Sequence, residues 1–102
     1  MEKLERVSRR LSEKQISKIE KEYDFFKEKG YVVTDEHSVY LTNGKYYFHY
    51  ILEKEGFHKV QCGYDISPSG RVYRTYNLIH AIGDYRFTED TKSFDTFINR
   101  YF

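Results

Sequence analysis

Residues 45–52 read KYYFHYIL, a stretch that decides the fold because it places four aromatic side chains and one histidine within eight positions. Successive side chains of a β-strand point to opposite faces, so the stretch divides into two sets. The more apolar set, which we expect to face the core, is Tyr46, Phe48, Tyr50 and Leu52. The other set is Lys45, Tyr47, His49 and Ile51. The alternation therefore predicts a central strand with one face buried and one face open.

Turn signals on both sides of this strand predict an antiparallel meander. Asn43-Gly44 is a favoured pair for a type I′ turn and would join a strand at 38–42 to one at 45–53. Lys54-Glu55-Gly56 and Ser67-Pro68-Ser69-Gly70 supply the next two reversals. Further strands are expected at 57–66 and 71–78, short edge strands at 31–34 and 85–88, and a solvated turn at 35–37.

Helices are predicted before and after the meander. Ser12 and Gln15 have the spacing of a capping box, so the first helix should begin at Glu13. Gly30 should end this helix in a Schellman-type stop with a Phe26–Tyr31 contact. Between these ends one apolar stripe recurs at helical spacing: Ile16, Ile19, Tyr23 and Phe26. A short second helix is expected from about residue 91, on the spacing of Phe94, Phe97, Ile98 and Tyr101.

These elements predict an α+β domain in which an N-terminal helix packs on an antiparallel meander of four to five strands, followed by a short C-terminal helix. Residues 12–102 form this single domain, and residues 1–11 form a basic arm, either flexible or a short helix. The expected core is Ile16, Ile19, Tyr23, Phe26, Phe48, Tyr50, Val60, Val72, Phe94 and Phe97.

Charge and cysteine content narrow the class of protein. The 102 residues carry 17 Lys and Arg against 16 Asp and Glu, so no overall field attracts the chain to polyanions. One cysteine excludes an internal disulfide, and no apolar run approaches the roughly 20 residues that span a bilayer. With a charged N-terminus in place of a secretory signal, we expect a cytoplasmic protein without a membrane partner. The unusual figure is 11 Tyr and 8 Phe.

Strand alternation places tyrosines and basic residues on the predicted open face. This face includes Lys45, Tyr47, His49, Lys59, Gln61, Arg71, Tyr73 and Thr75. Tyr and Arg are enriched at the energetic centres of protein interfaces, so we predict a small non-enzymatic protein that binds another protein. Tyr47, Arg71, Tyr73 and Arg74 would be its anchors. An inhibitor of a host protein, of phage or mobile-element origin, is one concrete version suggested by small size and composition.

Four alternatives remain open. The same face could bind RNA or single-stranded DNA, with Lys45, Lys59 and Arg71 on phosphates and an arm of Arg6, Arg9 and Arg10 assisting. It could be a solvated face of cross-strand pairs, or associate with a second copy through an unprotected edge strand. A metal-free ribonuclease would need His49, Tyr47, Arg71 and Tyr73 to converge.

Metal, cofactor and thiol chemistry are not predicted. The histidines lack metal-ligand spacing, and no glycine-rich phosphate loop is present. Cys62 and His58 lie four residues apart on one strand, roughly 13 Å, which is too far for a nucleophile and its base. Cys62 is expected to be a small core residue.

Overall fold

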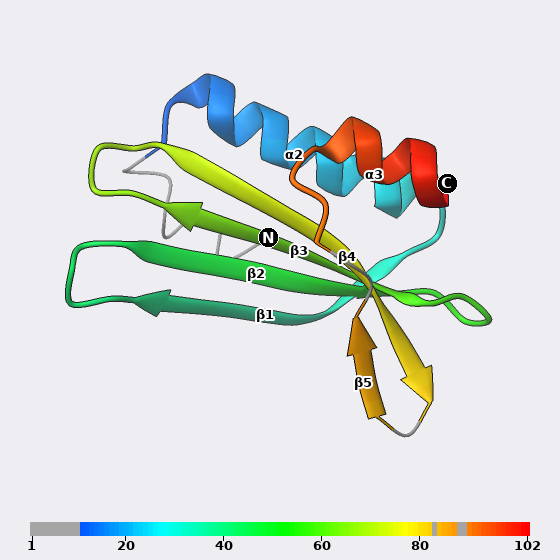
Figure 1. Cartoon of the computed structure of the whole chain (residues 1–102). Helices are drawn as coiled ribbons and strands as arrows, with labels where there is room; N and C mark the ends of the chain where they lie inside the picture. Colours follow the sequence, from blue (N-terminus) through cyan, green and yellow to red (C-terminus); the bar gives the residue numbers. More distant parts are fainter. Residues whose placement is uncertain (1–10, 83, 88–89) are drawn as a thin grey trace.

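Residues 11–82, 84–87 and 90–102 are described by a computed structural model, in which two helices cover one face of a five-stranded antiparallel sheet (Figure 1). With the labels of Figure 1, the elements are α2 (Glu13–Glu28), β1 (Val32–Tyr40), β2 (Tyr46–Glu53), β3 (Lys59–Ile66), β4 (Val72–Ile82), β5 (Asp84–Phe87) and α3 (Phe94–Tyr101). The strand order is β1-β2-β3-β4-β5, so the predicted α+β meander is confirmed. The predicted arm with Arg6, Arg9 and Arg10 lies, except for Leu11, outside the described residues.

Both ends of α2 form as their local sequence predicts. The Ser12 amide donates to Gln15 Oε1 at 2.9 Å and the Gln15 amide donates to Ser12 Oγ at 3.2 Å, which completes the capping box. At the other end Gly30 takes a φ of 93°, and the Tyr31 amide donates to the Phe26 carbonyl at 3.1 Å. The Phe26 and Tyr31 rings meet edge to face with centroids 5.9 Å apart, the hydrophobic contact expected of a Schellman stop.

The core lies between the helices and the predicted apolar face of the sheet. Phe48, Tyr50 and Leu52 of β2 are completely buried, so the alternation in the opening stretch assigned the two faces correctly. Among the other predicted core residues, Ile19, Phe26, Val60 and Phe97 are buried as well. The rest are partly buried against this cluster: Ile16, Tyr23, Val72 and Phe94.

The edge of the sheet at β1 differs from the prediction. Instead of two short strands separated by a solvated turn at 35–37, one strand runs continuously from Val32 to Tyr40. A register shift between Val33 and Asp35 lets this strand keep pairing with β2, and pairing satisfies backbone groups that a turn would expose to water. As a result His37 lies opposite His49.

The β1–β2 turn also differs from the predicted type I′. Asn43 has no positive φ, whereas Gly44 has a φ of 84° and donates its amide to the Leu41 carbonyl at 3.0 Å. A type I′ turn needs a positive φ at both central residues. Because only Gly44 of the Asn43-Gly44 pair has one, the turn is not of type I′.

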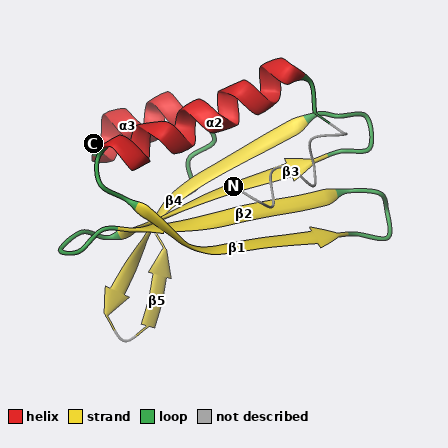
Figure 2. Ribbon diagram, turned by 180° about the vertical axis from the view of Figure 1, so that it is seen from behind, coloured by secondary structure: helices red, strands yellow, loops and turns green. Residues whose placement is uncertain are grey.

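The C-terminal third extends further than predicted. β4 continues to Ile82, and its hairpin with β5 projects from the sheet on the side away from the helices (Figures 1 and 2). Thr91 pairs with Tyr76 through two backbone hydrogen bonds of 2.8 and 2.9 Å, so α3 begins later than predicted, at Phe94 with Ser93 as its cap. This return places α3 beside α2 on the core side (Figure 2).

Candidate binding face of the sheet

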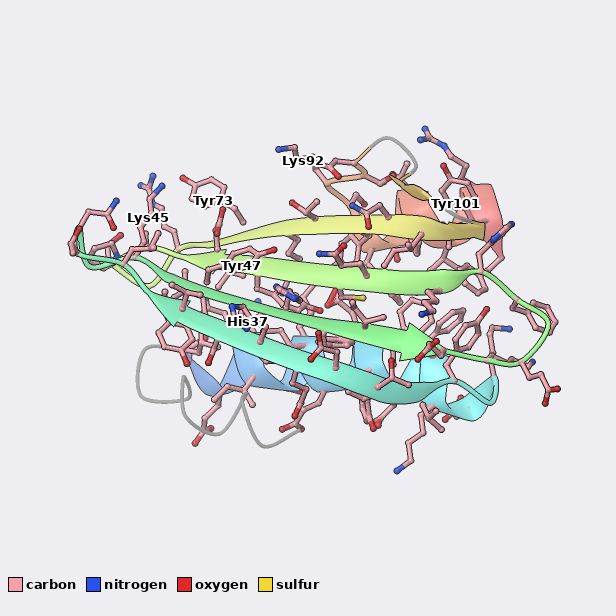
Figure 3. The ribbon with its side chains drawn as sticks, turned by 90° about the horizontal axis from the view of Figure 1, so that it is seen from below. His37, Lys45, Tyr47, Tyr73, Lys92 and Tyr101 are labelled. Atoms are coloured by element: carbon pink, nitrogen blue, oxygen red, sulfur yellow. The ribbon has the colours of Figure 1, made fainter. Side chains whose placement is uncertain are left out.

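The face opposite the helices orders its side chains in rows that cross the strands. Val39 lies opposite Tyr47, Tyr47 opposite Asp65, and Asp65 opposite Tyr73. This row places a carboxylate between two tyrosines, and Figure 3 shows Tyr47 and Tyr73 at the same end of the sheet. Tyr73 is 58% exposed, whereas Tyr47 is half-buried.

Cationic and aliphatic residues adjoin this row at the end of the sheet. The Leu41 amide donates to the Lys45 carbonyl at 2.8 Å, and the Ser67 amide donates to the Arg71 carbonyl at 2.9 Å, which aligns the four residues beyond the last strand pairs. Figure 3 shows Lys45 near Tyr73. We call this end the tyrosine patch, and its members are Val39, Leu41, Lys45, Tyr47, Asp65, Arg71 and Tyr73.

The next row joins two histidines to a glycine. His37 lies opposite His49 with ring centroids 5.2 Å apart, and the Tyr47 ring lies 5.3 Å from that of His49. Gly63 follows in the row, and a Cβ built on it would lie 3.3 Å from the Tyr47 hydroxyl oxygen. The missing side chain therefore lets the Tyr47 ring lie down across β3.

Acidic and amide groups surround the Tyr47 hydroxyl. Burial, and then the negative charges of Asp65 and Asp90, raise the pKa of Tyr47, and a hydrogen bond with Gln61 opposes the rise. Asn77 Nδ2 donates to Asp90 Oδ1 at 2.8 Å, which holds that carboxylate against β4. Tyr47 is consequently a neutral hydrogen-bonding group at neutral pH, beside fixed negative charge.

His49 is held in its neutral form. Burial, followed by the proximity of His37, lowers the pKa of His49, and Asp35 opposes this. Its Nδ1 is buried and has no hydrogen-bond partner among the described residues. A neutral imidazole offers one donor and one acceptor, so His49 can add polar specificity to this face without adding charge.

The remaining predicted site residues divide between two other places. Lys59 lies at the end of the face far from the tyrosine patch, where its Nζ pairs with Glu53 Oε1 at 2.9 Å. Arg74 was placed among the anchors of the open face, and that placement is wrong. Arg74 lies opposite the core residue Tyr64 in the β3–β4 register, so its side chain is on the side of the sheet that the helices cover. Its Nε lies 3.7 Å from Glu22 Oε1.

Glu22 is a buried carboxylate that the sequence analysis missed. The hydroxyls of Tyr64 and Tyr76 both donate to it, Tyr64 at 3.2 Å, and Tyr50 extends the network through a 3.3 Å contact with the Tyr64 hydroxyl. Burial raises the pKa of Glu22, while Tyr76, Arg74 and the other partners oppose the rise. The available signal was position: Glu22 lies three residues after Ile19 and four before Phe26, inside the apolar stripe of α2.

Cys62, the metal-ligating side chains and the residues of the ribonuclease alternative have the following places in the described part of the chain. Cys62 is completely buried, as predicted, and burial raises the pKa of its thiol. In the ranges 11–82, 84–87 and 90–102, no group of three or more His, Cys, Asp and Glu side chains is placed to hold a metal ion. Of the four residues of the ribonuclease alternative, Tyr47 and His49 contact each other, Tyr73 lies in the row of Tyr47, and Arg71 lies beyond the last strand pair of β4.

Comparison with protein-family models, with characterised proteins and with solved structures found no match to this chain. Within the residues that the structure describes, no helix has the length and apolarity needed to cross a membrane.

Proposed function

We propose that this chain is a small non-enzymatic binding protein whose tyrosine patch contacts another protein. The observation that supports this is the row Tyr47–Asp65–Tyr73, in which two aromatic side chains flank a carboxylate on an uncovered sheet face. Tyrosine supplies a large contact area with a polar tip at low cost in side-chain entropy, and such residues form the centres of protein interfaces.

The charges of this face favour a protein over a nucleic acid. Lys45 and Arg71 lie at its end, but Asp65 lies between the tyrosines on which bases would stack, and Asp90 lies close enough to influence Tyr47. Lys59 is already paired with Glu53. A phosphate backbone would meet these carboxylates, whereas a protein surface can place a basic side chain at Asp65 and acidic ones at Lys45 and Arg71.

Apolar exposure supplies the rest of the contact. Val39 is 36% and Leu41 is 40% exposed, and both lie on the β1 side of the patch. Together with Tyr73 on β4 they give apolar contact area on both sides of Asp65, and a mixture of apolar and charged surface is common in transient protein interfaces. We favour inhibition of a host protein as the consequence of this contact.

The test compares Tyr73→Ala with Phe57→Ala in pulldowns of the tagged protein from host lysate, each with and without nuclease. Phe57→Ala is the matched control, because Phe57 is 60% exposed and Tyr73 is 58% exposed, while the two residues lie at opposite ends of the sheet. We expect a stoichiometric protein that survives nuclease, is lost with Tyr73→Ala and is retained with Phe57→Ala. Affinity for that protein, measured by calorimetry, should fall by about tenfold or more with Tyr73→Ala.

Three outcomes would contradict the proposal. Captured nucleic acid that disappears with nuclease, with binding that weakens steeply in salt, would make the face a nucleic-acid surface. Sedimentation of the purified chain as a dimer that Tyr73→Ala dissociates would make a second copy its partner. Equal binding by both variants would make the tyrosine patch a solvated face.

A further inference from the structure

A cavity of about 420 Å³ lies on the helix side of the molecule, between α2, β4 and the segment that leads into α3. Its apolar part is formed by Phe25 and Phe94, whose rings meet edge to face with centroids 5.6 Å apart. The cationic residues on its wall are Lys18, Lys21, Arg74 and Lys92. These come from three segments far apart in the sequence, so only the fold brings them together.

The charge around this cavity is positive. Four cationic side chains line it against two carboxylates, Glu22 and Asp95, which leaves a net excess of two positive charges even with both carboxylates ionised. Glu22 already accepts hydrogen bonds from Tyr64 and Tyr76. Within the described part of the chain, no salt bridge is formed by Lys18, Lys21 or Lys92. Figure 3 shows Lys92 extending from the segment before α3.

Arg74 lines this cavity and forms an ion pair with Glu22. Its side chain is 15% exposed, and its Nε is buried without a hydrogen-bond partner among the described residues. The nearest carboxylate oxygen, Glu22 Oε1, is 3.7 Å away, which exceeds hydrogen-bond length. Because the Nε is enclosed, a ligand in the cavity would meet the terminal nitrogens of Arg74, and a guanidinium suits the oxygens of a phosphate group better than any other side chain does.

We propose that this cavity binds a phosphate monoester whose phosphoryl group meets Lys18, Arg74 and Lys92 while its apolar part lies on Phe25 and Phe94. The positive end of α3, capped by Ser93, faces the same space and adds to the attraction. The cavity and the tyrosine patch lie on opposite sides of the sheet, so this site is independent of the protein-binding proposal.

The test is a titration of the full chain with phenyl phosphate, at constant ionic strength, followed by amide NMR. Saturable shifts are expected at Phe25 and at residues 92–95. The double variant Lys18→Gln/Lys92→Gln should weaken binding by about tenfold, because two of the exposed cationic side chains around the cavity are lost. The control Lys14→Gln/Lys27→Gln removes the same charge from α2 at positions that do not line the cavity, and should bind within about twofold of the parent.

The source of the phosphate is distinguished by a second ligand. A phosphotyrosine peptide that binds more tightly than phenyl phosphate would identify a modified protein, and one that binds more weakly would identify a small molecule. Shifts that do not saturate, or equal weakening by the two double variants, would overturn the proposal, because both results describe screening by counterions instead of a site. Circular dichroism of each variant would confirm that it remains folded.

Discussion

Replacing Glu22 with alanine is expected to reduce the free energy of unfolding by about 3–5 kcal/mol, because its carboxylate is the acceptor for a buried tyrosine network. The hydroxyls of Tyr64 and Tyr76 would each lose their acceptor, and a buried donor left without one costs about 1–3 kcal/mol. Arg74 would add to this cost, because its side chain is only 15% exposed and would lose the carboxylate that lies 3.7 Å from its Nε. Glu22→Gln keeps the volume and one acceptor oxygen, so its expected cost is about 1–2 kcal/mol.

Urea denaturation at neutral pH, followed by circular dichroism, measures these differences. Glu20→Ala is the matched control, because Glu20 is an exposed residue of the same helix and its loss should change stability by less than about 0.5 kcal/mol. A cost of Glu22→Ala no larger than that of Glu20→Ala would refute the reasoning, since the carboxylate would then contribute nothing through its buried contacts.

The same variants give a pH test with a defined sign. Burial raises the folded-state pKa of Glu22 above its ordinary value of 4.5, so ionisation of Glu22 opposes folding. The part of the stability that is linked to this pKa shift is therefore fully present below about pH 4.5 and is lost as the pH rises through the folded-state pKa, whereas the hydrogen bonds from Tyr64 and Tyr76 remain. The stability of the parent relative to Glu22→Gln should fall over that interval, and a constant difference from pH 4 to pH 7 would exclude a raised pKa.

Three further predictions concern the open face and the core thiol. Gly63→Ala should displace the Tyr47 ring, since the new Cβ would lie 3.3 Å from its hydroxyl oxygen, and ring-proton shifts of Tyr47 would report this; unchanged shifts would contradict the close approach. The imidazole protons of His49 should titrate in NMR below the ordinary value of 6.5, so its contribution to stability is present above that value and is lost as the pH falls through the lowered pKa; a midpoint at or above 6.5 would contradict its burial. Cys62 should react with a thiol reagent only after unfolding in urea, because it is completely buried and its thiol pKa is raised; rapid reaction of the native protein would place it at the surface.

Much of the open face was predictable because strand alternation acts over short range. The sides of residues 45–52 followed directly from period two, and the turn at 67–70 kept β4 in the expected phase. Arg74 was predicted wrongly as an anchor of the open face. Strand alternation puts Arg74 on the side that the helices cover, but its charge suggested an exposed anchor, and only the tertiary structure shows that Glu22 of α2 lies beside it.

The prediction of a turn at residues 35–37 was wrong for a different reason. Asp35, Glu36 and His37 are poor strand formers by composition, and the sequence favours a turn. In the fold, hydrogen bonding to β2 outweighs that preference, and a register shift accommodates the extra residue. The His37–His49 contact follows from this pairing, so it was not predictable from either residue's neighbours.

Local sequence by itself determined the capping box of α2, its glycine stop and the two faces of the central strands, because each depends on residues within a few positions of one another. The tertiary structure alone decided the contacts between residues that are far apart in the sequence. Glu22 meets Tyr64 and Tyr76 across 42 and 54 residues, and the row Tyr47–Asp65–Tyr73 requires three strands in one register. Such contacts depend on how the whole sheet pairs and on where the helices cover it, and no short stretch of the chain contains that information.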